Sequence, residues 1–273
     1  MSVVSPLKAD SDPAVQEGNP FEGFFRDPLY LEFKNHLYNY LRRKEEIRSL
    51  LKDAKGLILE IGSGVSPIAE IGTGVIYSDA SEEAMRYMSQ KEGAEKVMAM
   101  SATDLSLKDE TVSLIICSEV IEHIKDDEKA LREMTRVLKP GGRLILTVPA
   151  HAYYFSYDDV FVKHERRYEI RPLVQRLEAL GFDDFQLSKV AGLIEKAGMI
   201  LAVLIFKMVS RFRRKSPQPS PIGHRILRTA LPIYKGANWL YSKLVKWEAK
   251  IIPFSLAAIV LICCEKSTRK VSP

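Results

Sequence analysis

Short apolar runs alternate with amphipathic stretches along the first two thirds of the chain. Four of the runs are continuous and lie at residues 56–60, 74–78, 112–117 and 143–148. Their length and continuity are typical of strands that are buried on both faces. The stretches 81–91, 128–138 and 171–180 place apolar residues at helical spacing instead. This alternation predicts an α/β fold with a doubly wound, Rossmann-like, mostly parallel sheet and a ligand crevice at the carboxyl ends of its strands.

Three further segments complete the predicted fold. Residues 29–51 have the spacing of one helix, 184–190 have the composition of a strand, and 256–264 are expected to form the last strand of a seven-stranded sheet. A helical insertion is expected before that last strand. We therefore divide the chain into a tail at 1–27, a Rossmann-like domain at 28–190 plus 255–268, and a basic amphipathic insertion at 191–254.

Composition places the chain among ordinary globular proteins. Of its 273 residues, 46% are hydrophobic and 27% are charged, which excludes a disordered chain. The cysteines Cys117, Cys263 and Cys264 lie in apolar runs without metal-ligand spacing. We therefore expect no disulfide framework, no metal site and a reducing, cytoplasmic location. The first residues lack a charged segment followed by an apolar one, so we expect no signal peptide there.

The charge of the chain is divided unevenly. Residues 191–254 carry 12 Lys and Arg against 2 Glu, a net charge of +10, whereas the whole chain has +5. This block alternates aromatic residues with lysines: Trp239, Tyr241, Lys243, Lys246, Trp247 and Lys250. Such a pattern is typical of segments at an anionic membrane surface, and it predicts a lid that lies peripherally on the inner membrane face. A soluble helical cap or a dimer interface explains it equally well. A nucleic-acid partner is disfavoured, because no base-modifying motif accompanies the block.

The first predicted strand runs into a glycine turn. Its sequence is Glu60-Ile-Gly62-Ser-Gly64, and the missing Cβ atoms of the glycines let a ligand approach the backbone closely. Pro67 stands where a dinucleotide-binding turn has its third glycine. An acid at the strand end suits a cationic ligand better than a pyrophosphate. The turn therefore favours a positively charged nucleoside.

Further acidic residues follow the next strands. Asp79 ends the second strand, where a carboxylate can accept both hydroxyls of a ribose. Asp104 follows a third strand, within reach of an adenine amino group, and Ser118-Glu119 closes the fourth. Because these ends meet at one edge of the sheet, the acids are expected to surround one ligand.

Together with Leu138-Lys-Pro-Gly-Gly-Arg143, this series resembles the class I S-adenosylmethionine-dependent methyltransferases, specifically their type 11 group, over residues 40–190. The resemblance implies S-adenosyl-L-methionine as the cofactor. It also implies roles for single residues, although Ser66 replaces a glycine that is usual in the family. By this resemblance, Glu60, Gly62 and Gly64 bind the methionine end of the cofactor, and Asp79 and Ala80 bind its ribose. Asp104 and Leu105 bind the adenine, and Ser118 and Glu119 lie near the methyl group.

The same resemblance directs attention to the segment after the fifth strand. A His-x-Arg-Arg-Tyr element, here His164 to Tyr168, recurs in a subset of type 11 enzymes. The cofactor's sulfonium makes its methyl group electrophilic, so the protein must align a nucleophile, and a general base helps if that nucleophile is a hydroxyl. The catalytic candidates are His151, His164, Arg167 and Tyr168.

Structural roles compete with these catalytic ones. Arg167 and Tyr168 are also placed to tie their loop to Asp158 and Asp159. His123 is expected to cap the helix that follows it.

The predicted activity is methyl transfer from S-adenosylmethionine to an oxygen, or less favourably a nitrogen, of a small-molecule, lipid-linked or glycolipid acceptor. A nicotinamide-dependent oxidoreductase is one alternative. A non-catalytic protein that retains a nucleoside pocket is the other.

Overall fold

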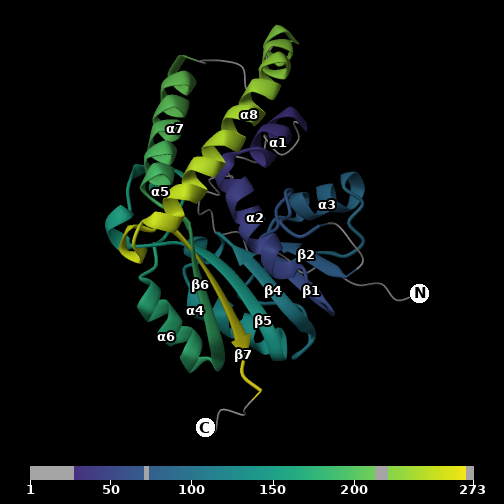
Figure 1. Cartoon of the computed structure of the whole chain (residues 1–273). Helices are drawn as coiled ribbons and strands as arrows, with labels where there is room; N and C mark the ends of the chain where they lie inside the picture. The colour runs from purple at the N-terminus through teal and green to yellow at the C-terminus, as the bar shows by residue number, and fades with distance from the viewer. Residues whose placement is uncertain (1–27, 71–73, 213–220, 269–273) are drawn as a thin grey trace, which may run out of the picture.

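The sheet has seven strands in the order β3-β2-β1-β4-β5-β7-β6 (Figure 1). The computed structural model describes residues 28–70, 74–212 and 221–268. The predicted tail at 1–27 lies outside the described residues. The strands are β1 (Ile58–Ile61), β2 (Val75–Asp79), β3 (Val97–Ala99), β4 (Val112–Ser118), β5 (Leu138–Pro149), β6 (Phe182–Ala191) and β7 (Ile259–Lys266). In the described sheet, β7 points opposite to the other six strands, which share one direction. The prediction of a doubly wound, mostly parallel sheet is confirmed.

Helices cover both faces of this sheet (Figure 1). They are α1 (Pro28–Asn35), α2 (Tyr38–Leu51), α3 (Glu82–Lys91), α4 (Asp127–Val137), α5 (Tyr157–Phe161), α6 (Ile170–Ala179), α7 (Leu193–Phe212) and α8 (Pro221–Ile251). Short 3₁₀ turns form η1 (Ile121–His123), η2 (Ala152–Tyr154) and η3 (Phe254–Leu256). Successive residues of β4 enter two different apolar clusters, Ile115 with α4 and α6 on one face and Ile116 with α2 and α3 on the other. Burial on both faces explains why the strands are apolar without alternation.

The expected single helix at 29–51 is wrong, because the structure has two helices there. Leu37 is extended, with φ −67° and ψ 135°, and His36 Nδ1 lies 2.8 Å from the carbonyl oxygen of Glu32 at the end of α1. The extended residue ends one helix and starts the next. Leu31 on α1 and Tyr40 on α2 are then buried in the same apolar cluster.

The helices α7 and α8 connect β6 to β7, as the predicted helical insertion before the last strand requires. β6 points in the same direction as β1–β5, because both β5 and β6 pair antiparallel with β7. The insertion therefore leaves the sheet at the edge where the parallel strands end. The carboxylate of Glu248 on α8 accepts the backbone N–H of Ile194 at 3.0 Å, which ties the start of α7 to α8. Lys246 of α8 binds Glu45 of α2 at 2.6 Å.

Candidate active site

A cavity of about 280 Å³ lies at the carboxyl ends of β1, β2 and β4. We call it the strand-end cavity. Six of the predicted cofactor residues line it: Glu60, Gly62, Gly64, Asp79, Ser118 and Glu119. The N-terminal helices add Lys34, Tyr40 and Arg43, which the sequence analysis missed. Tyr40 and Arg43 are three residues apart on α2, and that helical spacing was the only available signal.

Glu60 organises the turn that follows β1. Its buried carboxylate accepts the backbone N–H groups of Ile68 at 2.7 Å and Ala69 at 2.9 Å. Burial raises the pKa of Glu60 to about 7, although these two hydrogen bonds favour the charged form. From α2, the Tyr40 hydroxyl donates to the carbonyl of Pro67 and Arg48 donates to the carbonyl of Ile68. The turn is therefore held by side chains on both sides of it.

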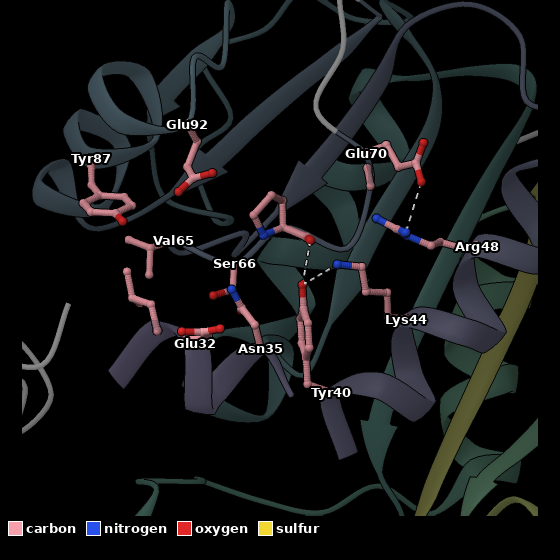
Figure 2. A pocket seen from close by; sticks show the side chains of 13 residues that line it. Glu32, Asn35, Tyr40, Lys44, Arg48, Val65, Ser66, Glu70, Tyr87 and Glu92 are labelled. Atoms are coloured by element: carbon pink, nitrogen blue, oxygen red, sulfur yellow. Dashed lines mark hydrogen bonds and ion pairs between the residues drawn. The ribbon is translucent and has the colours of Figure 1, made fainter. Parts of the chain in front are cut away.

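A second cavity of about 540 Å³ lies between this turn, α1, α2 and α3. Tyr40 and Ser66 line both cavities. Figure 2 shows Lys44 reaching the Tyr40 hydroxyl, at 3.2 Å, and Arg48 pairing with Glu70, at 3.1 Å. Because Lys44 donates to Tyr40 and Tyr40 donates to Pro67, a chain of hydrogen bonds runs along the wall of the second cavity.

The two glycines of the turn serve different needs. Gly62 has φ +70°, and a Cβ atom there would lie 2.3 Å from Cγ2 of Val120. The space that Gly62 leaves is therefore filled by a protein side chain rather than kept open for a ligand. Gly64 has φ +54°, and its nearest neighbour to a Cβ would be Oδ2 of Asp79 at 3.9 Å. Close ligand approach, which was expected at both positions, has room only at Gly64.

Asp79 joins the turn to the end of β2. Its Oδ2 accepts the backbone N–H of Gly64 at 3.0 Å, and its Oδ1 accepts that of Ser81 at 2.9 Å. Each carboxylate oxygen has a second lone pair, so Asp79 is oriented by these bonds and can still accept further hydrogen bonds.

Three of the predicted cofactor residues lie outside the lining of the strand-end cavity. Ala80 and Asp104 are exposed, whereas Leu105 is buried in the apolar core. The backbone N–H of Leu105 donates to the carboxylate of Glu133 on α4 at 2.9 Å.

Glu119 is held in a strained position at the end of β4. Its φ of +55° lies in the left-handed region, which is costly for residues other than glycine. Its backbone N–H donates to the carbonyl of Thr147 at 3.0 Å, and its Oε1 lies 3.3 Å from the Thr147 hydroxyl. Its other carboxylate oxygen lies 3.9 Å from Arg43. Neighbouring elements therefore fix both the backbone and the carboxylate.

Two of the predicted catalytic residues, His164 and Arg167, lie in a buried ionic network. Asp159 lies at its centre, 2.8 Å from His164 Nδ1, 2.7 Å from Arg167 Nε and 2.9 Å from Lys196 Nζ. Burial alone would raise the pKa of Asp159, but the hydrogen bonds from His164 and Lys196 hold it well below its usual range. This network joins α5 and α7 to the segment that carries the His-x-Arg-Arg-Tyr element.

The other candidates make structural contacts. Arg167 binds Asp159, as the structural alternative expected, but the Tyr168 hydroxyl lies 2.8 Å from Asp127 rather than near Asp158 or Asp159. His151 places Nδ1 3.1 Å from Glu169 and Nε2 2.9 Å from the carbonyl of Phe254. These two contacts link the end of β5 to the start of α6 and to η3. None of the four catalytic candidates lines the strand-end cavity.

His123 does not cap the next helix, so that expectation is wrong. The N-cap of α4 is Asp126, whose side chain accepts the N–H of Lys129 at 3.0 Å. His123 instead directs Nδ1 to the carbonyl of Lys163, at 3.1 Å, and stacks edge-on against His164 with ring centres 4.8 Å apart. Burial and the neighbouring His164 lower the pKa of His123.

Two unpartnered polar groups test whether the strand-end cavity suits a polar ligand. The hydroxyls of Ser63 and Ser66 are buried without a hydrogen-bond partner among the described residues, and both serines line the cavity. Buried polar groups are nearly always paired, so these hydroxyls indicate a ligand. Acids from β2 and β4 and cations from α1 and α2 surround the same space. The cavity therefore fits a zwitterionic nucleoside such as S-adenosylmethionine.

Comparison with known proteins gives the same answer. A family model described as "Methyltransferase domain" matches residues 59–146, which include most of β1, all of β2, β3 and β4, and most of β5. Residues 59–146 form a methyltransferase domain of the S-adenosylmethionine-dependent type. S-adenosylmethionine is the cofactor of this methyltransferase, and the oxidoreductase and scaffold alternatives are set aside.

Relatives of this methyltransferase extend over different shares of its length. A Mycolicibacterium smegmatis protein named "Probable S-adenosylmethionine-dependent methyltransferase" is 26% identical over 64% of this chain and 69% of its own. A "Ubiquinone biosynthesis O-methyltransferase" of Parvibaculum lavamentivorans is 30% identical over 37% of this chain and 45% of its own. A solved S-adenosylmethionine-dependent methyltransferase of Thermotoga maritima shares the fold, with a TM-score of 0.55 and 20% identity, and covers 90% of this chain and 97% of its own.

Proposed function

We propose that this methyltransferase acts on a hydroxyl oxygen of an acceptor that binds beside Glu119. The observation that carries the proposal is a carboxylate that can accept a proton and lines the strand-end cavity, Glu119, together with the imidazoles of His123 and His164, which meet at Glu122 three residues further along the chain. Methylation of a hydroxyl releases its proton, and groups that accept protons at this place favour such an acceptor. The similarity to a protein named as an O-methyltransferase supports oxygen over nitrogen.

We also propose which residues hold the cofactor. Bound S-adenosylmethionine supplies an electrophilic methyl group. Asp79 would accept hydrogen bonds from the ribose, as the sequence indicated. Arg43 and Lys34, which line the cavity from α2 and α1, would bind the carboxylate of the methionine moiety. Ser63 and Ser66 would donate their unpartnered hydroxyls. Glu60 would act mainly by holding the turn around these groups.

The acceptor proposal is tested by the chemical nature of the product. The protein is incubated with S-adenosylmethionine that carries carbon-13 in its methyl group, together with lipid and polar extracts of cells. Carbon-13 NMR should then report a methyl group on oxygen, and His164→Ala should reduce its formation by a factor of about 10²–10⁴. A label found only on nitrogen or carbon would overturn the proposal.

A lipid-linked acceptor and an anionic membrane surface remain our proposal for the insertion. Ile233, Leu240, Leu244, Trp247 and Ile251 follow one face of α8. Between 44% and 77% of the surface of each is exposed. Phe254, which follows the end of α8 by three residues, is 43% exposed.

Further exposed apolar side chains lie on the segments next to the end of α8 and the start of α7. Tyr153 of η2 is 62% exposed, and its hydroxyl bonds the carbonyl of Ser255 just after Phe254. Leu193, at the start of α7, is 43% exposed. Among the described residues, no helix has the length and apolar character needed to span a bilayer. The stripe is therefore proposed to rest on the membrane surface and not to cross it.

Vesicle flotation tests the membrane proposal. We expect the protein to float with vesicles that contain anionic lipid, and salt should release it because exposed charges are screened. Trp247→Ala should weaken flotation more than Trp239→Ala does. The two tryptophans are both 58% exposed, but Trp239 lies off the stripe, so it is a matched control. Equal effects, or no flotation at low salt, would refute the proposal.

A further inference from the structure

Glu122, His123 and His164 bring one oxygen and two nitrogen ligand atoms within 4.8 Å of one another. We call these three residues the His–Glu cluster. Glu122 is fully buried in η1, and neither of its carboxylate oxygens has a hydrogen-bond partner among the described residues. An unpaired buried carboxylate is costly, so its retention points to a positively charged partner.

Both imidazoles of the cluster are oriented as metal ligands are. His164 Nδ1 lies 2.8 Å from a carboxylate oxygen of Asp159, and His123 Nδ1 lies 3.1 Å from the carbonyl oxygen of Lys163. Because both partners are acceptors, each Nδ1 carries the proton and each Nε2 has a free lone pair. Metal-binding histidines use this arrangement, in which an outer acceptor fixes the tautomer.

The separations within the cluster leave room for an ion. His164 Nε2 lies 3.8 Å from Oε1 of Glu122, which is too long for a hydrogen bond. Ligand atoms at about 2.1 Å from a shared ion are separated by roughly 3–4 Å. Because the ligand atoms lie within 4.8 Å of one another, an ion would need the most distant of them to approach by about 1–2 Å.

The two segments that supply the ligands are joined to each other. The N–H of Glu165 donates to the carbonyl of Glu122 at 2.8 Å, and Arg166 donates to the carbonyl of Lys125 at 2.9 Å. The Tyr168 hydroxyl lies 3.1 Å from the carbonyl of Ile121. Well-formed metal sites rest on such supporting contacts. Within the His-x-Arg-Arg-Tyr element, Arg166 and Tyr168 therefore hold His164 close to η1.

We propose that Glu122, His123 and His164 bind a divalent metal ion that holds the acceptor oxygen beside Glu119. Two imidazoles and one carboxylate suit transition-metal ions such as Zn²⁺ and Mn²⁺ better than Mg²⁺. The expectation of no metal site considered cysteine spacing, whereas these ligands come from two segments about forty residues apart in the chain.

The chemical part of this inference rests on the proposed function. A metal ion lowers the pKa of a bound hydroxyl. The acceptor O–H gives its proton to the carboxylate of Glu119, and its oxygen forms the new bond to the methyl carbon. The carbon–sulfur bond of the cofactor breaks, and S-adenosylhomocysteine and a methyl ether remain.

Metal binding is measured directly, without an acceptor. Purified protein is stripped with EDTA and titrated with Mn²⁺ or Zn²⁺, with Mg²⁺ as a comparison, by calorimetry and, for Mn²⁺, by electron paramagnetic resonance. We expect one Mn²⁺ or Zn²⁺ per chain. Glu122→Gln should weaken binding at least 10-fold, and His123→Ala should do the same. His151→Gln is the matched control, because His151 also pairs with a carboxylate but lies outside the cluster.

The outcomes separate this inference from the proposed function. No binding, or binding that Glu122→Gln leaves unchanged, overturns the metal site, and EDTA-resistant formation of a methyl ether would then leave the proposed function intact. Binding at the cluster together with an N-methylated product overturns the proposed function but not the metal site. Glu122→Gln replaces a fully buried carboxyl by an amide of the same shape, so it should fold. Its melting temperature should not respond to Mn²⁺, whereas that of the wild type should rise.

Discussion

The side chain of Glu60 and the backbone of Ile68 are joined by a 2.7 Å hydrogen bond across the turn that follows β1. A residue that sequence patterns assign to the cofactor thus also supports the cavity wall. Two opposing effects act on the pKa of Glu60, because burial favours the neutral form and the N–H donors favour the charged form. A cationic ligand nearby adds to the second effect.

Cofactor binding should therefore release a proton from Glu60. The pKa of Glu60 is about 7 without ligand, and the ammonium group of S-adenosylhomocysteine should lower it. Affinity should then fall as pH drops below about 7, by at most about tenfold per pH unit for one linked proton. Calorimetry at neutral pH, in buffers of different ionisation enthalpy, counts the released proton.

Glu60→Gln provides the control for this linkage. The amide cannot ionise, so the pH dependence of S-adenosylhomocysteine affinity should become flat between pH 5 and pH 7 even if the affinity itself is lower. A variant that keeps the wild-type slope would show that another group releases the proton.

Gly62→Ala should destabilise the fold by packing rather than by excluding the cofactor. The new methyl group would meet Cγ2 of Val120 at 2.3 Å. Gly93→Ala isolates the backbone cost, since Gly93 also has a positive φ, +69°, but has no atom near a Cβ. We expect a loss of about 1 kcal/mol at Gly93 and about 2–4 kcal/mol at Gly62 in denaturant unfolding.

A double variant checks this explanation. Val120→Ala should recover part of the stability lost in Gly62→Ala, because it removes the colliding methyl group. Strictly additive losses in the two variants would contradict the contact.

The sequence predicted the sheet well because its strands are continuous apolar runs, buried on both faces. It failed at residues 29–51, where helical spacing persists through Leu37 although the backbone there is extended. The break depends on packing of both helices against one core, which a local pattern does not contain.

The sequence predicted the position of those cavity residues that lie at strand ends. Asp79 and Glu119 line the strand-end cavity because each lies at a strand end. It missed Arg43, which reaches the cavity from a helix that the strand-end rule ignores. It also could not show that His164 faces Glu122 across a gap of 3.8 Å, because that meeting depends on how two loops pack.

Asp79 and Asp104 give a matched pair for the nucleoside site. Both follow strands, but only Asp79 lines the strand-end cavity, whereas Asp104 is exposed outside it. Asp79→Asn should lower the affinity for S-adenosylhomocysteine by about 10- to 100-fold, as expected for lost hydrogen bonds to a charged group. Asp104→Asn should change it by less than about threefold. Calorimetry measures both affinities. A larger loss for Asp104→Asn than for Asp79→Asn would show that the ribose assignment to Asp79 is wrong.

Glu195 on α7 should make the protein less stable as pH rises. Burial, and next the nearby Glu119, raise the pKa of Glu195 to about 8, from an ordinary value of 4.5. Between these values the folded chain keeps a proton that the unfolded chain has released, so the free energy of unfolding falls with rising pH, by at most about 1.4 kcal/mol per unit. Glu60 acts with the same sign, but only up to about pH 7. Glu122, whose pKa is also raised well above its usual range by burial, acts with the same sign, so the contribution of Glu195 is the difference between wild type and Glu195→Gln in urea unfolding between pH 7 and pH 8. The variant should show the smaller decline there. A decline that persists unchanged in the variant would mean that Glu195 is already ionised in the folded protein.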